Sequence, residues 1–185
     1  MIADTLREAG DKMTKAIEVV KEDFASIRAG RATPAMFSKI HAEYYGSPTP
    51  LQQLASFQVP EARTVLITPY DRSATGAIEK ALRDSDLGVN PTTDGVVIRV
   101  NLPALTEERR KEYIKLARTK AEDARVSLRN IRRRAKEELD RIARDGEAGE
   151  DEVTRAEKEL EASTRRHVDT VDEHLKAKES ELIEV

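Results

Sequence analysis

Two residue types, cysteine and tryptophan, are absent from this sequence, and long apolar runs are missing as well. None of the 185 residues is cysteine, which excludes a disulfide framework, a thiolate metal site and a cysteine nucleophile. Tryptophan is also absent and aromatic residues make up only 4%, which favours helices over an aromatic-rich sheet core. No run approaches the roughly 20 apolar residues of a spanning helix, and the N-terminal MIADTLREAGDK has no continuous apolar core for secretion. We therefore expect a soluble, cytoplasmic protein without a membrane partner.

Sequence motifs typical of enzymes are missing as well. The chain contains no Gly-x-x-x-x-Gly-Lys loop, no Gly-x-Gly-x-x-Gly turn and no His-Glu-x-x-His pair. His167 and His174 are seven residues apart on one helix face, so a metal site is geometrically conceivable. Packing at the edge of a helical seam is the favoured interpretation. We expect no catalytic residue, no metal and no cofactor.

The most informative segment that is present runs from Leu105 to Arg144. Its apolar residues recur mostly at steps of three and four, which predicts a helix buried along one stripe. The residues of this stripe are Ile114, Ala117, Ala121, Ala124, Leu128, Ile131, Ala135 and Ile142. Thr106 is the expected N-cap, followed by Glu107 and Glu108 in the first turn.

Two further amphipathic helices are expected. The first begins near Ile2 and ends at Gly30, in a left-handed conformation, with Pro34 preventing its continuation. The other runs from about Asp151 to Glu184. Long amphipathic helices with short joins bury their stripes best against one another. The pattern predicts an elongated antiparallel three-helix bundle, about 60 Å long at 1.5 Å per residue.

Between the first two helices, the pattern changes to that of an inserted α/β domain that is mostly β. Residues 39–103 contain six of the seven prolines and the strand-like runs IHAEYY, ASFQVP, TVLITPY and VVIRVN. One helix is expected from about Ser73 to Ser85, closed by Gly88. The predicted fold class is α+β, with the bundle formed by residues 1–30 and 104–185 and the insert by 31–103.

The sequence also predicts where the aromatic residues of the insert lie and how its two connections to the bundle behave. Tyr44, Tyr45 and Phe57 are predicted to be core residues, and an aromatic patch that stacks RNA bases is the weaker alternative. Two connections side by side favour a hinge. The hinge residues are expected to be Gly30, Arg31, Pro34, Pro103 and Thr106. Gly88 and Gly95 are expected to supply turns.

Charge is distributed unevenly, although the net charge is only −3. Residues 104–145 hold 14 Lys and Arg against 9 Asp and Glu, whereas residues 146–185 hold 6 against 13. Five cations fall on one face of the long helix: Arg118, Arg125, Arg129, Arg132 and Lys136. They either pair with the acidic third helix or hold a phosphate backbone. Two features favour phosphate binding. The consecutive Arg132, Arg133 and Arg134 point in different directions, so they cannot all pair with one neighbouring helix. The planar guanidinium of arginine also suits contact with phosphate.

Six motifs, collinear along the whole chain, resemble bacterial ribosome recycling factor. They are FASIRAGRATP at Phe24–Pro34, EYYGSPTPLQQLAS at Glu43–Ser56, SDLGVNP at Ser85–Pro91, LPALTEERRKE at Leu102–Glu112, ARVSLRNIRRRAK at Ala124–Lys136, and the ending KAKESELIEV. The resemblance implies a three-helix bundle with a small α/β domain on two linkers. It also implies that the protein acts with elongation factor G to split ribosomes left on messenger RNA after termination. The GTP is then used by the elongation factor.

Ribosomal RNA of the large subunit is the partner that the resemblance implies for the bundle. An arginine of the RNxRR segment is central in the family and corresponds to Arg132, flanked by Arg129 and Arg133. The ERRK segment contributes Arg109 and Arg110, and the GRA segment Arg31. With Arg28 beside the hinge and Arg125 on the cationic face of the long helix, these eight arginines are the candidate RNA contacts.

Two further points concern Arg134 and the choice of partner. Arg134 departs from the acidic residue expected at that position in the family. The insert is expected to face the elongation factor, and the protein to be a monomer. The alternative from another class is a bundle adaptor or chaperone whose insert grips a protein client.

Overall fold

The computed structural model describes residues 1–184, and each of its two units combines separate stretches of chain. The helical unit consists of Met1–Phe24 and Lys115–Glu179. The β unit consists of Ala25–Ile114 and the described residues from Ser180 on. The expected division was a bundle of residues 1–30 and 104–185 and an insert of residues 31–103. The observed limits differ because the end of α1, the start of α4 and the end of α5 are grouped with the β unit.

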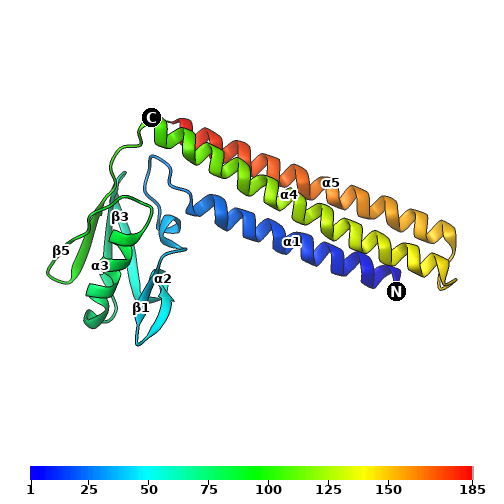
Figure 1. Cartoon of the computed structure of the whole chain (residues 1–185), viewed down its shortest axis with the longest axis horizontal. Helices are drawn as coiled ribbons and strands as arrows, with labels where there is room; N and C mark the ends of the chain where they lie inside the picture. The colour runs from blue at the N-terminus through cyan, green and yellow to red at the C-terminus, as the bar shows by residue number, and fades with distance from the viewer. Residues whose placement is uncertain (185) are drawn as a thin grey trace. The chain divides into compact units, whose positions relative to one another are not determined.

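Three long helices supply the helical unit: α1 (Ile2–Ser26), α4 (Glu107–Arg144) and α5 (Glu150–Ile183). Within this unit α4 runs antiparallel to both α1 and α5 (Figure 1). The core consists of one buried stripe from each helix, with Met13, Leu128 and Val171 fully buried. Small residues such as Ala117 and Ala121 on the α4 stripe allow the helices to approach closely. The predicted three-helix bundle is confirmed.

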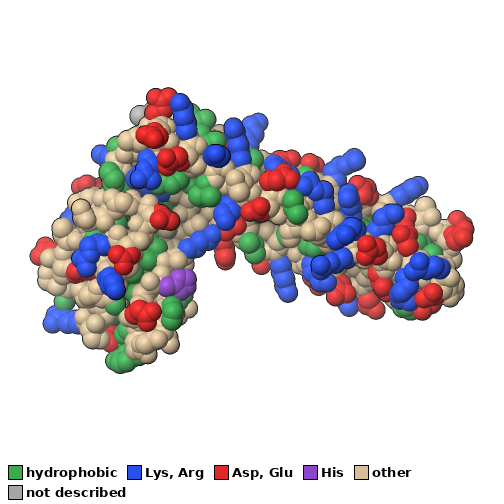
Figure 2. Space-filling view, in the orientation of Figure 1, with side chains coloured by type: hydrophobic (Ala, Val, Ile, Leu, Met, Phe, Trp, Pro, Cys, Tyr) green, Lys and Arg blue, Asp and Glu red, His purple; other side chains and the backbone are tan. Residues whose placement is uncertain are grey.

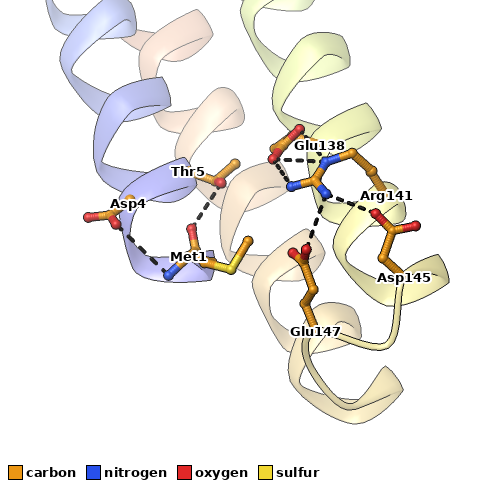
Figure 3. Close-up of polar contacts among 7 residues, drawn as sticks. All are labelled: Met1, Asp4, Thr5, Glu138, Arg141, Asp145 and Glu147. Atoms are coloured by element: carbon orange, nitrogen blue, oxygen red, sulfur yellow. Dashed lines mark hydrogen bonds and ion pairs between the residues drawn. The ribbon is translucent and has the colours of Figure 1, made fainter.

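A short turn joins α4 to α5 and ends α4 where the sequence predicts. Gly146 adopts a left-handed φ of 68°, its N–H donates to the Ala143 carbonyl, and the N–H of Glu147 donates to the Ile142 carbonyl. This pair of bonds is a Schellman motif. Arg141 reinforces it by donating to Glu138 at 2.6 Å and to Asp145 at 2.9 Å (Figure 3). The turn therefore has both backbone and ionic support.

The β unit contains a four-stranded antiparallel sheet in the order β3-β4-β6-β5. The strands are β3 (Ala55–Glu61), β4 (Thr64–Pro69), β5 (Thr92–Asp94) and β6 (Val97–Asn101). Val65 and Ile67 of β4 pair with Val100 and Ile98 of β6, and all four side chains are fully buried. Helix α3 (Thr75–Asp84) adds the fully buried Ile78 and Leu82 to the core.

A separate two-stranded hairpin, β1 (His41–Tyr44) and β2 (Ser47–Pro50), completes the strands of the β unit. The shorter elements are η1 (Pro34–Phe37), α2 (Leu51–Leu54) and η2 (Arg72–Ala74). The sequence does not predict β2, because Pro48 and Pro50 suggest a turn. Prolines are tolerated there because β2 pairs on one side only.

Two predictions about the insert and its connection are wrong. Helix α1 ends at Ser26, and Gly30 is not among the residues with positive φ. The chain leaves the helix early, and Ile27 and Ala29 are nevertheless buried in the β unit. Tyr45 is 85% exposed and is not a core residue, because it occupies the tip of the β1–β2 hairpin.

The turns predicted for the same region are present, but Phe57 and Tyr44 are only half-buried and are not among the buried core residues. Gly88 and Gly95 have φ values of 67° and 66°, as expected for turns. Phe57 is half-buried and contacts Phe37, with ring centroids 5.4 Å apart. Tyr44 is also half-buried. Among residues 1–184, no helix has the length and apolar character needed to cross a membrane.

Candidate nucleic-acid interface

Helix α4 presents arginines on two distinct surfaces because its core stripe fixes the rotation of the helix. Thr106 caps the helix as predicted: its Oγ1 accepts from the backbone N–H of Arg109 at 3.1 Å. The buried stripe passes through Ala121 and Leu128, and successive residues are ~100° apart on the helix. One group of arginines therefore lies at the edge facing α5, and another points outward to solvent.

The α5-facing edge consists of Arg118, Arg125 and Arg132, each paired with a carboxylate of α5. Arg125 donates to Asp172 Oδ1 through Nε at 2.9 Å and through Nη2 at 2.6 Å. Arg118 donates to Glu179 at 2.7 Å. The pairing of basic and acidic helices, one of the two interpretations of the charge pattern, therefore accounts for this edge.

Arg132 is the least tightly held residue of the α5-facing edge. Its Nη1 lies 3.6 Å from Glu161 Oε1, and its side chain is 35% exposed. An exposed ion pair at this distance contributes about 0–1 kcal/mol. A phosphate can therefore displace Glu161 from Arg132 at small cost.

The outward face consists of Arg129 and Arg133. Within the described residues, Arg133 is exposed and has no ion-pair or hydrogen-bond partner. Arg129 is 47% exposed and donates to Glu122 at 2.7 Å. Hydrogen bonds from Arg129 and then Arg125 keep the pKa of Glu122 below its ordinary value. Glu122 thus bridges the outward face and the α5-facing edge.

Arg134 lies on a third side of α4, toward α1. It lines a groove of the helical unit with Lys12, Glu8 and Glu138. This placement separates it from Arg133 and from the α5-facing edge. Figure 2 shows Lys and Arg interleaved with Asp and Glu over the helices.

The β unit holds the other four candidate arginines, and their exposure differs. Arg28 is only 5% exposed, and its guanidinium donates to the Pro103 carbonyl. Burial lowers the pKa of Arg28, and its Nε has no partner among the described atoms. Arg28 is therefore a structural residue in this conformation. Its charge is not presented to an RNA surface.

Arg31, Arg109 and Arg110 are more accessible. Arg31 and Arg109 are exposed, and Arg109 lies 3.7 Å from Glu112. Arg110 is half-buried with an unpartnered, buried Nε among the described atoms. These three side chains can present cations to a ligand.

The expected hinge residues lie on segments that the β3–β4 turn holds at two points. Ala32 N–H donates to the Ala62 carbonyl at 2.6 Å, and Leu102 N–H donates to the Arg63 carbonyl at 2.7 Å. Pro34 begins η1, Thr106 caps α4, and Pro103 accepts from Arg28. The hinge itself stays a prediction.

The structure also identifies residues that the single motifs do not reveal. Glu122 and Asp172 organise the arginines but stand in no basic motif. The signal for Glu122 is its spacing, since it precedes Arg125 by three residues and Arg129 by seven, whereas Asp172 is remote from both in the sequence. His167 Nδ1 lies 2.7 Å from the Ser163 carbonyl on its own helix. No cluster of metal-ligating side chains occurs in the described part of the chain.

Comparisons with known proteins identify the family. A family model described as ribosome recycling factor matches residues 20–183. The ribosome-recycling factor of Kineococcus radiotolerans is 75% identical, and that of Paenarthrobacter aurescens 65% identical, each over the full length of both chains.

Solved structures agree with this assignment. A solution structure of the ribosome recycling factor is 42% identical with a TM-score of 0.77, covering 100% of this chain and 98% of that one. A model of the Thermus thermophilus ribosome recycling factor, presented with Escherichia coli elongation factor G bound to the post-termination complex, is 40% identical. Its TM-score is 0.70, with both chains fully covered. The chain belongs to the ribosome recycling factor family.

Proposed function

We propose that this chain recycles ribosomes after translation termination, acting with elongation factor G to separate the subunits and release messenger RNA. The observation that carries the proposal is the family match over residues 20–183, joined to full-length similarity with a relative described in a post-termination complex with elongation factor G. The GTP is used by the elongation factor, and the chain needs no cofactor. The chain works as a monomer in the cytoplasm.

Large-subunit ribosomal RNA is the proposed ligand of the α4 arginines. The contact surface comprises Arg129, Arg132 and Arg133, with Arg31, Arg109 and Arg110 adding cations from the β unit. Their exposure and the weak pairing of Arg132 support this choice. Arg28 is left out because it is buried, and Arg125 contributes indirectly because Asp172 and Glu122 already hold it.

A mechanical role follows if the bundle binds RNA and the small domain contacts the elongation factor. The arginines anchor the rigid bundle on RNA, the elongation factor pushes the hinged small domain, and movement of the bundle then disrupts contacts between the subunits. The small domain, residues 31–103, is the part that faces the elongation factor.

Sedimentation of vacant post-termination ribosomes tests the function directly. The reactions contain the chain, elongation factor G and GTP, with each factor alone for comparison and an anti-association factor to trap subunits. We expect free subunits only when both factors are present. Intact ribosomes in every reaction would contradict the proposal, and absence of any binding would favour an adaptor that acts on protein clients.

Arg132→Glu tests the RNA surface. Reversing this charge should lower ribosome affinity by at least tenfold, equivalent to about 1.4 kcal/mol, with the helical signal retained. Arg155→Glu is the matched control, because Arg155 is also an exposed bundle arginine but lies on α5. Normal ribosome binding by a folded Arg132→Glu protein would rule out this surface.

A further inference from the structure

A groove lies between α1 and α4 of the helical unit, on the side of α4 that carries Arg134. Its volume is about 370 Å³, and residues of both helices line it. Ala9 of α1 and Ala135 of α4 form its floor, because both line the groove and both are almost fully buried. Each of these side chains is a single methyl group. The small residues therefore leave an open space with an apolar floor between the two helices.

Two larger apolar side chains line the groove as well. Ile131 of α4 is half-buried, and Met1 is 59% exposed. Figure 3 shows Met1 at the start of α1, on the side that faces Glu138 of α4. A ligand in the groove would cover these exposed apolar atoms, and burial of apolar surface favours binding. The groove thus suits a ligand with an apolar body.

The charged side chains of the groove leave one cation unpaired. Three carboxylates line the groove, and each has a cationic partner. The pairs are Asp4 and Arg7 at 3.1 Å, Glu8 and Lys12 at 3.5 Å, and Glu138 and Arg141 at 2.6 Å (Figure 3). Arg134 is exposed and has no ion-pair or hydrogen-bond partner among residues 1–184. A ligand with a negative charge can therefore bind Arg134 without displacing a carboxylate of the protein.

The charge and the size of the groove favour a small carboxylate over a phosphate or a nucleic acid. The planar guanidinium of arginine can donate two parallel N–H bonds to one carboxylate. A phosphate carries more negative charge, which the three carboxylates of the groove would repel more strongly. Pockets for small molecules have volumes of about 300–1,000 Å³, and the groove lies near the lower end of this range.

Arg134 is also the residue at which this chain departs from the pattern that its family resemblance predicts. The resemblance leads us to expect an acidic residue at this position. An acidic side chain beside Glu8 and Glu138 would leave the groove without an unpaired cation. The site is therefore expected in this chain and not in relatives that carry the acidic residue.

We propose that the groove between α1 and α4 binds a small amphiphilic monocarboxylate, such as a medium-chain fatty acid. The carboxylate pairs with Arg134, and the hydrocarbon chain lies over Ala9 and Ala135. This inference goes beyond the proposed function and does not depend on it, because Arg134 is not among the arginines assigned to RNA.

Titration of the full chain with sodium octanoate, followed by amide chemical shifts, tests the site. We expect saturable shift changes at the residues of α1 and α4 that line the groove. Arg134→Glu should weaken octanoate binding at least tenfold, and Arg134→Ala should weaken it without adding a negative charge. Both variants should keep the helical signal because Arg134 is exposed. Arg155→Glu is the matched control and should stay within twofold, because Arg155 is an exposed arginine of α5 and does not line the groove.

Two further probes separate the contributions of the carboxylate and the hydrocarbon chain. Acetate keeps the carboxylate without the chain, and octyltrimethylammonium keeps the chain with the opposite charge. Both should bind at least tenfold more weakly than octanoate. Equal binding of octanoate and octyltrimethylammonium would overturn the proposal. Unchanged octanoate binding by Arg134→Ala, or shift changes that do not saturate or that lie outside the groove, would overturn it as well.

Discussion

Two surfaces of one helix, the α5-facing edge and the outward face of α4, use the same residue type differently. At the α5-facing edge, Arg125 is 23% exposed and forms hydrogen bonds to Asp172 and Glu122. On the outward face, Arg133 has no partner among the described residues. The difference shows that one arginine-rich helix holds some arginines in ion pairs with α5 and leaves others unpaired, and only the unpaired ones are free to take the binding role that we propose. Substitutions at matched positions can test this separation.

The largest effect should come from reversing the charge of Arg133. Arg133→Glu should weaken ribosome binding by tenfold or more, about 1.4 kcal/mol, because it removes an unpaired cation and adds an anion. Its free energy of unfolding should change by no more than about 0.5 kcal/mol, as is usual for exposed positions. Ribosome pelleting and urea denaturation measure the two quantities. A large loss of stability would place Arg133 with the structural arginines.

Arg125→Glu should show the opposite pattern. It places a carboxylate beside Asp172 and Glu122, so the free energy of unfolding should fall by about 1–2 kcal/mol, the range common for destabilising substitutions. Arg125→Met, which keeps most of the side-chain volume without the charge, is the control and should cost less. If Arg125→Glu is as stable as the wild type but fails to bind ribosomes, Arg125 is a binding residue and not a structural one.

Salt dependence sharpens the same distinction. Removing one cation that binds a phosphate should reduce the slope of log affinity against log salt by about 1. Arg133→Ala should therefore lower the slope, whereas Arg125→Met should leave it unchanged. Ribosome affinity measured at several salt concentrations provides the comparison. Equal slopes for both variants would mean that neither arginine contacts a phosphate.

The smallest effect concerns Glu122, which connects the two surfaces. Its pKa is lowered from 4.5 by hydrogen bonds from Arg129 and Arg125. A carboxyl group with a lowered folded-state pKa stabilises the fold above its unfolded pKa, and this contribution is lost as pH falls through the folded value. The wild type should thus lose stability below about pH 4.5, and Glu122→Gln should lose less. Denaturation curves between about pH 3 and 7 test this.

Sequence patterns predict the regular parts of this molecule well, because the long helices repeat their apolar residues over many turns. The Thr106 cap, the end of α4 and the strand-like runs of the insert are confirmed. Gly30 is the exception: a glycine after an apolar stripe suggests a helix end, but α1 ends at Ser26, and Ile27 and Ala29 are buried beyond that end. Tertiary contacts of this kind leave no local pattern.

The candidate interface is less predictable for a related reason. The consecutive arginines indicate that their side chains point to several sides of α4. Which of the α4 arginines are paired depends on the carboxylates of α5, which is remote in the sequence. Arg28 shows the limit most clearly, since its place beside the expected hinge made it a candidate RNA contact, whereas its 5% exposure makes it structural. The core position predicted for Tyr45 is wrong because aromatic residues in a strand-like run are usually buried, and the turn that exposes this one has no Asn-Gly signal.

Because α4 is long and uninterrupted, a small rotation of the helix about one end produces a large movement at its other end. Its 38 residues rise about 1.5 Å each, giving a rod of about 57 Å. Rotation by roughly 10° about one end moves the other by about 10 Å, several times the reach of any hydrogen bond. Alanine at four of the seven buried positions of α4 leaves few long side chains that could shift and absorb such a motion. A small rotation of α4 at one end would therefore move its other end by several ångströms.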